Sequence, residues 1–421
     1  MCGSPKSGPL GSTMAEDGQN PAPYYRILTL DGGGTWALIQ VHALQRLFGS
    51  GAKGHDVLEK FDLVVANSGG GIVAAALACD MTLERLRLHF EDKRQREKIF
   101  RPKLPEAIGR RLPFPRYATE VKYDGLREAL APNGELALPD WHAKHPKLAH
   151  LMFIGFDFDT NRAAFFRSHA DSRSSSGSPT RATILDATHA TSNAPVVYFD
   201  EPTKMHVAPH LRRYWDGAVA GYNNPSLAAA IEALANGASR EQIRILSIGT
   251  GTVLRPRRPA HDATTDGRFV GGETPSVLGN LRKLAGAILD DPPDVASYMA
   301  HVTLGGRVPA GAEVVRDGPV VRMSPCVRPM CGDDGKWKWG PAFQGAEWQR
   351  LTSIDMDAID DDDVALIVEL AKRWLDDTVP NQAIRADERL VAQIGHDTFG
   401  AAAAVAEATA MARRAFKVER G

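Results

Sequence analysis

The sequence lacks a long apolar run, has few cysteines and carries almost no net charge. No stretch reaches the roughly 18 uninterrupted apolar residues typical of a membrane-spanning helix. The four cysteines are too scattered for a disulfide framework, and Cys326 and Cys331 lack the second pair of ligands that a zinc site needs. A net charge of -1 gives no overall reason to bind a nucleic-acid polymer. Because the N-terminus also shows no basic-then-apolar export signal, we expect a cytoplasmic protein. Because no metal-ligand pattern is found in the sequence, we expect neither a metal nor a cofactor.

The length and composition allow a large folded protein. A chain of 421 residues with 43% hydrophobic residues can form one large α/β domain or two domains. Residues 1–23 are rich in Gly, Pro and Ser, which predicts a disordered N-terminal tail. We expect a catalytic domain over residues 24–380, with a cap at about 93–130, and a C-terminal helical arm over 381–421 packed on the same domain.

Short β-rich runs alternate with helical patterns along most of the chain. The runs with strand character are residues 25–30, 61–66, 150–159, 163–167, 196–199, 243–248 and 320–324. This alternation is typical of a mostly parallel sheet covered by helices on both faces. The four acids at 360–363 precede an apolar helical pattern and lack the spacing of an EF-hand, so they predict the start of a helix, where the macrodipole favours acids.

The most informative stretch is 61–75, FDLVVANSGGGIVAA, in which an apolar run leads into a turn of small residues and then a helix. Ser68 lies in that turn. A serine on a strained strand-to-helix corner exposes its hydroxyl above a sheet, beside helix N-terminal amides. Here Ala66 replaces the first glycine of the G-x-S-x-G pattern, and three glycines follow the serine. The pattern favours a nucleophilic serine, although an ordinary buried serine turn fits the same residues.

A second glycine-rich turn follows the strand at residues 25–30. The sequence Asp31-Gly32-Gly33-Gly34 separates that strand from a helical pattern over 36–48. Glycines here let the backbone point its N–H groups at a phosphate or at a carbonyl oxygen that becomes negative. The third glycine of a dinucleotide-binding loop and the Gly-Lys-Ser/Thr of a P-loop are both missing. Because a candidate nucleophile follows one strand later, we interpret this turn as an oxyanion hole rather than as a phosphate site.

Residues 93–122 are locally basic, with ten Lys and Arg against three Glu, and they include several apolar side chains. This composition fits a solvated loop and helix that cover the sheet. It also fits a cap that contacts anionic lipid head groups while apolar side chains enter the interface. The residues that we expect at a substrate or membrane contact are Trp36, Phe100, Arg110, Arg111 and Phe114.

Five short blocks, each weak alone, occur in the order found in the patatin-like phospholipases, and the chain resembles that family over about residues 25–252. They are LDGGG at 30–34, ANSGGG at 66–71, ATSNAPVVYF at 190–199, WDGAVAGYNNP at 215–225 and SIGTGT at 247–252. The resemblance implies a three-layer α/β/α acyl hydrolase with a Ser-Asp dyad. Ser68 would be the nucleophile, Asp216 the base and later the acid, and the amides of Gly32, Gly33 and Gly34 the oxyanion hole.

The chain departs from the common family pattern beside the glycine loop, where Trp36 and Ala37 replace the usual basic residue and glycine. A Ser-His-Asp triad would need a histidine. The histidines available for that role are His42, His189, His206 and His210. They rank below Asp216, because nothing in the sequence places a histidine at a catalytic turn.

The resemblance predicts hydrolysis of phospholipid acyl esters by a protein that contacts membranes peripherally. Two other functions remain open. The first is an esterase that acts on soluble acyl esters. The second is a regulated effector, because some similar bacterial enzymes are switched on by cyclic nucleotides in antiphage defence. A small-molecule activator or homo-oligomer of this kind would involve residues 255–273 and the C-terminal arm.

Overall fold

The computed structural model describes residues 24–104, 115–169, 181–207, 210–255, 268–269, 293–332, 336–340, 342–386 and 392–417. The predicted tail, most of the 255–273 loop, and the expected contact residues Arg110, Arg111 and Phe114 lie outside these ranges. Among the helices that the structure describes, none has the length and apolar character needed to cross a bilayer.

A central sheet organises the described residues, with strands in the order β5-β6-β3-β2-β1-β7-β9 and β4 paired to β3. The strands are β1 (Tyr25–Leu30), β2 (Leu63–Ala66), β3 (His150–Asp157), β4 (Arg162–Arg167), β5 (Thr203–Val207), β6 (His210–Asp216), β7 (Ile243–Ile248) and β9 (Val320–Met323). The inner strands β3, β2, β1, β7 and β9 are mutually parallel, whereas β4 and β6 run antiparallel to β3. The predicted mostly parallel sheet is therefore confirmed.

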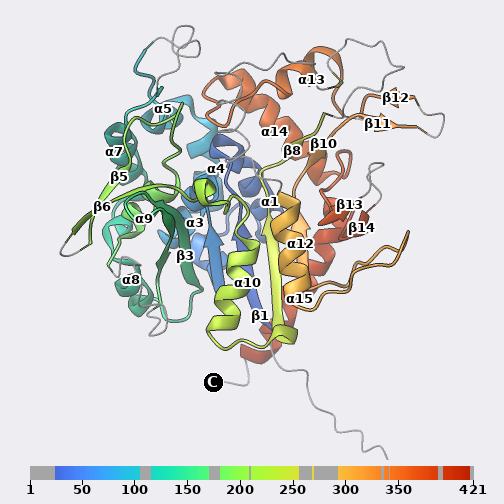
Figure 1. Cartoon of the computed structure of the whole chain (residues 1–421), viewed down its shortest axis with the longest axis horizontal. Helices are drawn as coiled ribbons and strands as arrows, with labels where there is room; N and C mark the ends of the chain where they lie inside the picture. The colour runs from blue at the N-terminus through green and yellow to red at the C-terminus, as the bar shows by residue number, and fades with distance from the viewer. Residues whose placement is uncertain are drawn as a thin grey trace, which may run out of the picture.

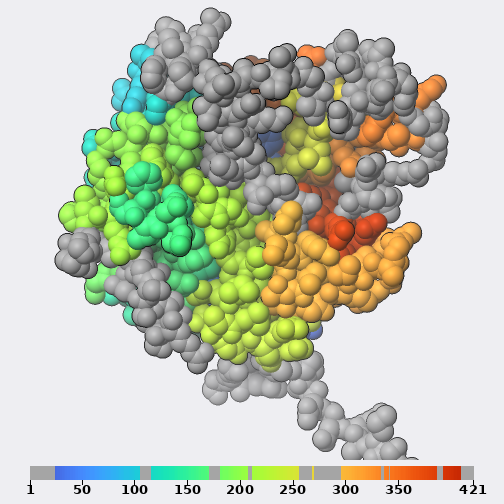
Figure 2. Space-filling model, in the orientation of Figure 1, coloured from blue at the N-terminus to red at the C-terminus, as the bar shows by residue number. Residues whose placement is uncertain are grey.

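Helices cover both faces of this sheet. Because side chains alternate along a strand, Leu28 and Leu30 of β1 lie in one buried cluster and Ile27 lies in another. The first cluster holds α1 (Leu38–Phe48), α3 (Ser68–Ala78), α9 (Ile184–Thr191) and α14 (Asp361–Leu375), and the second holds α10 (Ser226–Ala235) and α12 (Pro293–Thr303). Figure 1 shows α10 and α12 in front of the sheet. In Figure 2 the blue N-terminal residues are almost hidden by this layer. The arrangement is the predicted three-layer α/β/α fold.

Shorter elements complete the domain. The remaining α-helices are α2 (Gly54–Leu58), α4 (Leu83–Glu91), α5 (Lys93–Ile99), α7 (Thr119–Leu130), α8 (Leu138–Lys144), α13 (Gly345–Leu351) and α15 (Phe399–Lys417). The 3-10 turns are η1 (Gly34–Ala37), η2 (Asn133–Glu135), η3 (Gly217–Ala220) and η4 (Arg240–Gln242). Two-residue or three-residue strands pair as β8 (Thr252–Val253) with β10 (Cys326–Val327), β11 (Met330–Cys331) with β12 (Trp337–Lys338), and β13 (Arg385–Ala386) with β14 (Ala392–Ile394).

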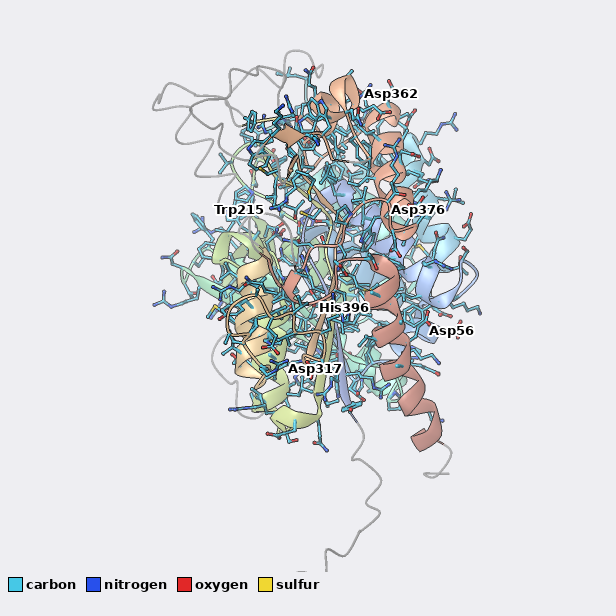
Figure 3. The ribbon with its side chains drawn as sticks, turned by 90° about the vertical axis from the view of Figure 1, so that its right-hand side faces the viewer. Asp56, Trp215, Asp317, Asp362, Asp376 and His396 are labelled. Carbon is cyan, nitrogen blue, oxygen red and sulfur yellow. The ribbon has the colours of Figure 1, made fainter. Side chains whose placement is uncertain are left out.

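Two sequence-based expectations differ from the structure. The β-rich run at 196–199 forms turns rather than a strand, because Val196 adopts a left-handed φ of 71° and Tyr198 and Phe199 pack into an aromatic cluster. The C-terminal arm is not helical throughout, since β13 and β14 precede α15. Figure 3 shows α15 as a long helix down one side of the molecule, where it contacts β9 and α14.

Candidate active site

The turn between β2 and α3 holds Ser68 in a strained conformation. Its φ is 51°, a left-handed value that side chains other than glycine rarely adopt, and its side chain is buried. The glycines that follow are required by close packing. A Cβ added to Gly69 would lie 2.5 Å from the Gly34 carbonyl oxygen, and one on Gly70 would lie 2.5 Å from the Leu30 carbonyl oxygen. The sequence therefore makes the strand-to-helix corner that was predicted for a nucleophile.

The register of the sheet brings Asp216 to the same corner. In the pairing of β2 with β3, Ala66 lies opposite Phe153, and in the pairing of β6 with β3, Asp216 lies opposite Gly155. Because β4 occupies the opposite edge of β3, the ends of β2 and β6 meet along one and the same edge of β3. Asp216 is buried, and the Ser68 side chain lies close enough to lower the pKa of its carboxyl group.

The Asp216 carboxylate is held by two further donors. Its Oδ1 accepts hydrogen bonds from Asn67 Nδ2 at 3.0 Å and from the Ala218 amide at 2.9 Å. Burial raises the pKa of Asp216, while the hydrogen bonds and the nearby charge of Lys122 act in the opposite direction. A desolvated carboxyl group with a raised pKa is a better acceptor for a serine proton than one in water.

Thr191 anchors the nucleophile from the third element of the site, α9. Its Oγ1 accepts a hydrogen bond from the Ser68 amide at 3.1 Å and donates one to the Ile154 carbonyl at 2.5 Å. Asn67 and Thr191 were not singled out from the sequence. Thr191 does lie inside one of the five blocks, at 190–199, and Asn67 inside another, so both could have been found by asking which polar residues flank the dyad.

The glycine loop lies against the nucleophile, but its three amides are not equivalent. The Gly32 amide donates to the Asn223 carbonyl at 2.9 Å. For Gly33 and Gly34, no acceptor is found among the described residues. The Gly34 nitrogen would lie 2.8 Å from a Cβ placed on Gly69, and a Cβ on Gly32 would lie 2.9 Å from Ser68 Cβ. Gly33 and Gly34 are thus the loop amides that can serve an oxyanion.

Ser68 and Asp216 open into a cleft of about 620 Å³ with both polar and apolar walls. Its charged lining residues balance in number, with Arg116, Arg255 and Arg322 against Asp31, Asp216 and Asp355. Arg322 donates to Asp31 at 2.6 Å in a fully buried pair, where burial raises the pKa of Asp31 and Arg322 opposes that shift. Arg116 donates to Asp355 at 2.9 Å and to Asp357 at 2.7 Å. The cleft walls therefore present fixed dipoles rather than a large net charge.

Two small apolar cavities, of about 10 and 40 Å³, lie along α7. The first is lined by Ser68, Gly69, Ile99, Phe100, Lys122 and Phe199, among others. It shares Gly34, Ile72, Ile99 and Phe100 with the second, which continues to Ala76, Leu126, Ala129 and Leu130. Ser68 therefore borders both the polar cleft and the first apolar cavity.

The remaining contact residues fall in two places. Trp36 lines the polar cleft and donates from Nε1 to the Asp355 carbonyl at 3.2 Å. Phe100 lines both apolar cavities and packs edge-on against Tyr117 with ring centroids 5.5 Å apart. Within the part of the chain that the structure describes, no group of three or more His, Cys, Asp or Glu is placed to hold a metal ion.

Comparison with known proteins places this geometry in a family. Residues 28–230 match the family model described as patatin-like phospholipase. That range contains the glycine loop, Ser68 and Asp216, while the block at 247–252 falls outside it. This stretch therefore belongs to the patatin-like phospholipases, a family of lipid ester hydrolases, and the predicted family is confirmed. No curated protein matches the chain.

Several solved structures resemble the chain at low sequence identity. VipD from Legionella pneumophila has 11% identity and a TM-score of 0.33, with 83% of this chain and 67% of VipD covered. The type III effector protein ExoU has 17% identity and a TM-score of 0.24, with 41% of this chain and 40% of ExoU covered. ExoU in its complex with SpcU from Pseudomonas aeruginosa has 15% identity and a TM-score of 0.24, with 42% of this chain and 39% of that chain covered. The chain therefore spans about two fifths of the length of ExoU.

Proposed function

We propose that the chain hydrolyses carboxylic esters of membrane phospholipids with a Ser68–Asp216 dyad and releases fatty acid. The observation that carries this proposal is that Ser68 and Asp216 line one polar cleft, while Ser68 also borders a small apolar cavity. The family match over residues 28–230 supports the reaction class.

In the first half of the reaction, Ser68 Oγ attacks the ester carbonyl while its proton passes to the Asp216 carboxylate. The carbonyl oxygen becomes an oxyanion, which the amides of Gly33 and Gly34 stabilise. One such donor is commonly worth about 3 kcal/mol of barrier lowering. The intermediate collapses to a Ser68 acyl ester, and the departing alcohol takes the proton from Asp216.

In the second half, water attacks the acyl ester and gives its proton to Asp216. Ser68 Oγ regains a proton as the fatty acid leaves, so the dyad returns to its starting state. No step needs a metal or cofactor, because the Asp216 carboxylate acts as the base and the backbone amides of Gly33 and Gly34 stabilise the oxyanion.

The polar cleft and the apolar cavity that Ser68 borders fit the two parts of a phospholipid. An acyl chain entering the apolar cavities along α7 would contact Ile72, Ile99 and Phe100. The glycerol and head group would then occupy the polar cleft. Apolar side chains at the cleft, Val196 and Leu254, are 55% and 43% exposed, which suits peripheral contact with a lipid surface.

A comparison of substrates tests this proposal. The purified protein is given mixed phospholipid vesicles and, separately, soluble short-chain acyl esters, with Ser68→Ala as the background. Release of fatty acid from vesicles at a rate above that of soluble esters is expected. Cleavage of soluble esters alone would identify a soluble esterase, and silence on both until a cyclic nucleotide is added would identify the regulated effector.

A further inference from the structure

Lys122 is a fully buried lysine on the wall of the cavity that contains Ser68. It lies on α7, its relative exposure is 0%, and it lines the first apolar cavity together with Ser68 and Gly69. Burying an ammonium group is strongly unfavourable unless it is compensated by charge or hydrogen bonds. A lysine in this position therefore calls for an explanation beyond packing.

The direct partners of Lys122 are neutral. Its Nζ donates to the His189 carbonyl at 3.0 Å and to Ser192 Oγ at 3.3 Å, and it lies 4.4 Å from the centroid of the Phe199 ring. Among the described residues, no carboxylate forms an ion pair with it. Asp216 is tied to the same loop, because its amide donates to the carbonyl of Asn193, the neighbour of Ser192, at 3.0 Å. The Asp216 charge raises the pKa of Lys122.

The electrostatic coupling between the two groups is reciprocal. Burial lowers the pKa of Lys122 well below its usual value, and the Asp216 charge opposes this. Burial likewise raises the pKa of Asp216, and the Lys122 charge opposes that. Each group therefore favours the charged form of the other.

The surroundings leave Asp216 and Lys122 as the pair of opposite charges at this place. The α7 helix packs against α5, α9 and η2. From α9, His189 faces the lysine, and burial followed by the Lys122 charge lowers the pKa of His189, so it stays neutral. Many other charged groups on these elements and around β6 have partners of their own: Arg96 with Asp361, Lys98 with Glu128, Arg127 with Asp124 and Glu135, Asp186 with the Thr183 amide, Arg212 with Asp157, and Lys204 with Glu201. Arg94, Glu97 and Glu120 of the same helices are exposed to solvent.

We propose that Lys122 is a positioning residue of the dyad, whose buried ammonium group keeps the Asp216 carboxylate charged and ready to accept the Ser68 proton. This inference rests on the proposed Ser-Asp mechanism. It gives the dyad, which has no histidine, a fixed positive charge near the base. During acylation the proton moves from Ser68 Oγ to Asp216 and the negative charge moves to the oxyanion.

The test follows the reaction of Ser68 with a fluorophosphonate probe as a function of pH. The serine oxygen bonds to phosphorus, fluoride leaves, and the hydroxyl proton passes through Asp216 to solvent, so the labelling rate reports the ionised base without a lipid substrate. Lys122→Met removes the charge, and Lys122→Gln is a second neutral variant that can still donate to the His189 carbonyl. Lys122→Arg keeps the charge. Thermal unfolding checks that each variant is folded.

We expect the acid limb of the labelling rate to move upward by at least about one pH unit in the neutral variants, because loss of the nearby cation raises the pKa of Asp216. Lys122→Arg should keep the limb close to that of the wild type. A limb that does not move in folded Lys122→Met or Lys122→Gln, or a rate that falls equally at every pH, would show a structural role only and overturn the inference. If the wild type is labelled no faster than Ser68→Ala at any pH, the proposed dyad fails, and the role of Lys122 fails with it.

Discussion

Asn67 Nδ2 donates a hydrogen bond to Asp216 Oδ1 at 3.0 Å, so the residue before the candidate nucleophile holds the candidate base. The contact is tight, because a Cβ added to Gly217 would lie 2.4 Å from Asn67 Oδ1. The elbow and the β6 end are thereby fixed to each other. A misplaced base is costly in catalysis, since small shifts in the reacting geometry cost large factors in rate.

Asn67→Asp should raise the pKa of Asp216, because a second carboxylate would face it where an amide now donates. The fraction of ionised base at pH 7 would fall, and the acid limb of kcat/KM would move to higher pH. We expect a loss of about tenfold or more at pH 7 that is partly recovered at pH 9. The control is Asn161→Asp in the exposed turn between β3 and β4, which should leave the pH profile unchanged. An unchanged profile in Asn67→Asp would contradict the assigned base.

Gly69→Ala should reduce kcat by about 100-fold or more, because the added Cβ would press on Gly34 and displace the loop amides. Gly51→Ala is the matched control, since a Cβ there meets nothing within 4 Å and its φ is ordinary. Steady-state kinetics on one acyl ester compares the two. Full activity in a folded Gly69→Ala would show that the glycine loop is not the oxyanion hole.

Ala129→Phe should shorten the preferred acyl chain, because the new ring would fill the far end of the second apolar cavity. Arg127→Phe places the same ring on the same helix but on its exposed side, so it should have little effect. The measurement is the ratio of kcat/KM for long and short acyl esters. We expect this ratio to fall in Ala129→Phe alone, and an equal fall in both variants would place the acyl chain elsewhere.

Val196→Asp should weaken activity on vesicles more than activity on soluble esters. The side chain is 55% exposed at the cleft, and a carboxylate there would be repelled by anionic lipid. The expected result is a loss of at least several-fold on anionic vesicles with unchanged hydrolysis of a soluble ester. Equal loss on both substrates would remove Val196 from the membrane contact.

Glu232→Gln should lower stability in a pH-dependent way. Although burial opposes it, hydrogen bonds from His169 and Arg167 lower the pKa of Glu232 from 4.5 to about 2. The ionised carboxylate therefore contributes stability above pH 4.5 that is lost as the pH falls toward 2. We expect a loss of about 2 kcal/mol in the free energy of unfolding at pH 7, after allowance for solvent screening. Urea unfolding at several pH values checks this, and a difference that persists undiminished at pH 2 would contradict it.

The parts of the site that the sequence predicted are those held by local backbone chemistry. The Ser68 corner and the Gly32–Gly34 turn can be recognised in the sequence by their glycines. The structure leaves no room for a Cβ at these positions. The mostly parallel sheet followed from alternating strand and helix patterns, because such patterns leave few other ways to bury the strands. The start of α14 at Asp361 followed from acids in its first turn.

The parts that were missed depend on packing between distant segments. Lys122 lies in a basic stretch where lysines are ordinarily solvated, and its burial follows from the packing of α7 against α9. Phe100 faces a cavity rather than solvent for a similar reason, since it packs on Tyr117 and Phe199. The run at 196–199 has strand composition, but the left-handed Val196 and the aromatic cluster override that propensity.

Fatty-acid release from phospholipid vesicles by the wild type, Ser68→Ala and Asp216→Ala tests the central claim most directly. Circular dichroism and thermal unfolding establish that each variant is folded. The account predicts release by the wild type and loss of nearly all of it in both variants, because nucleophile and base act as one unit. Substantial release by a folded Asp216→Ala would contradict the dyad.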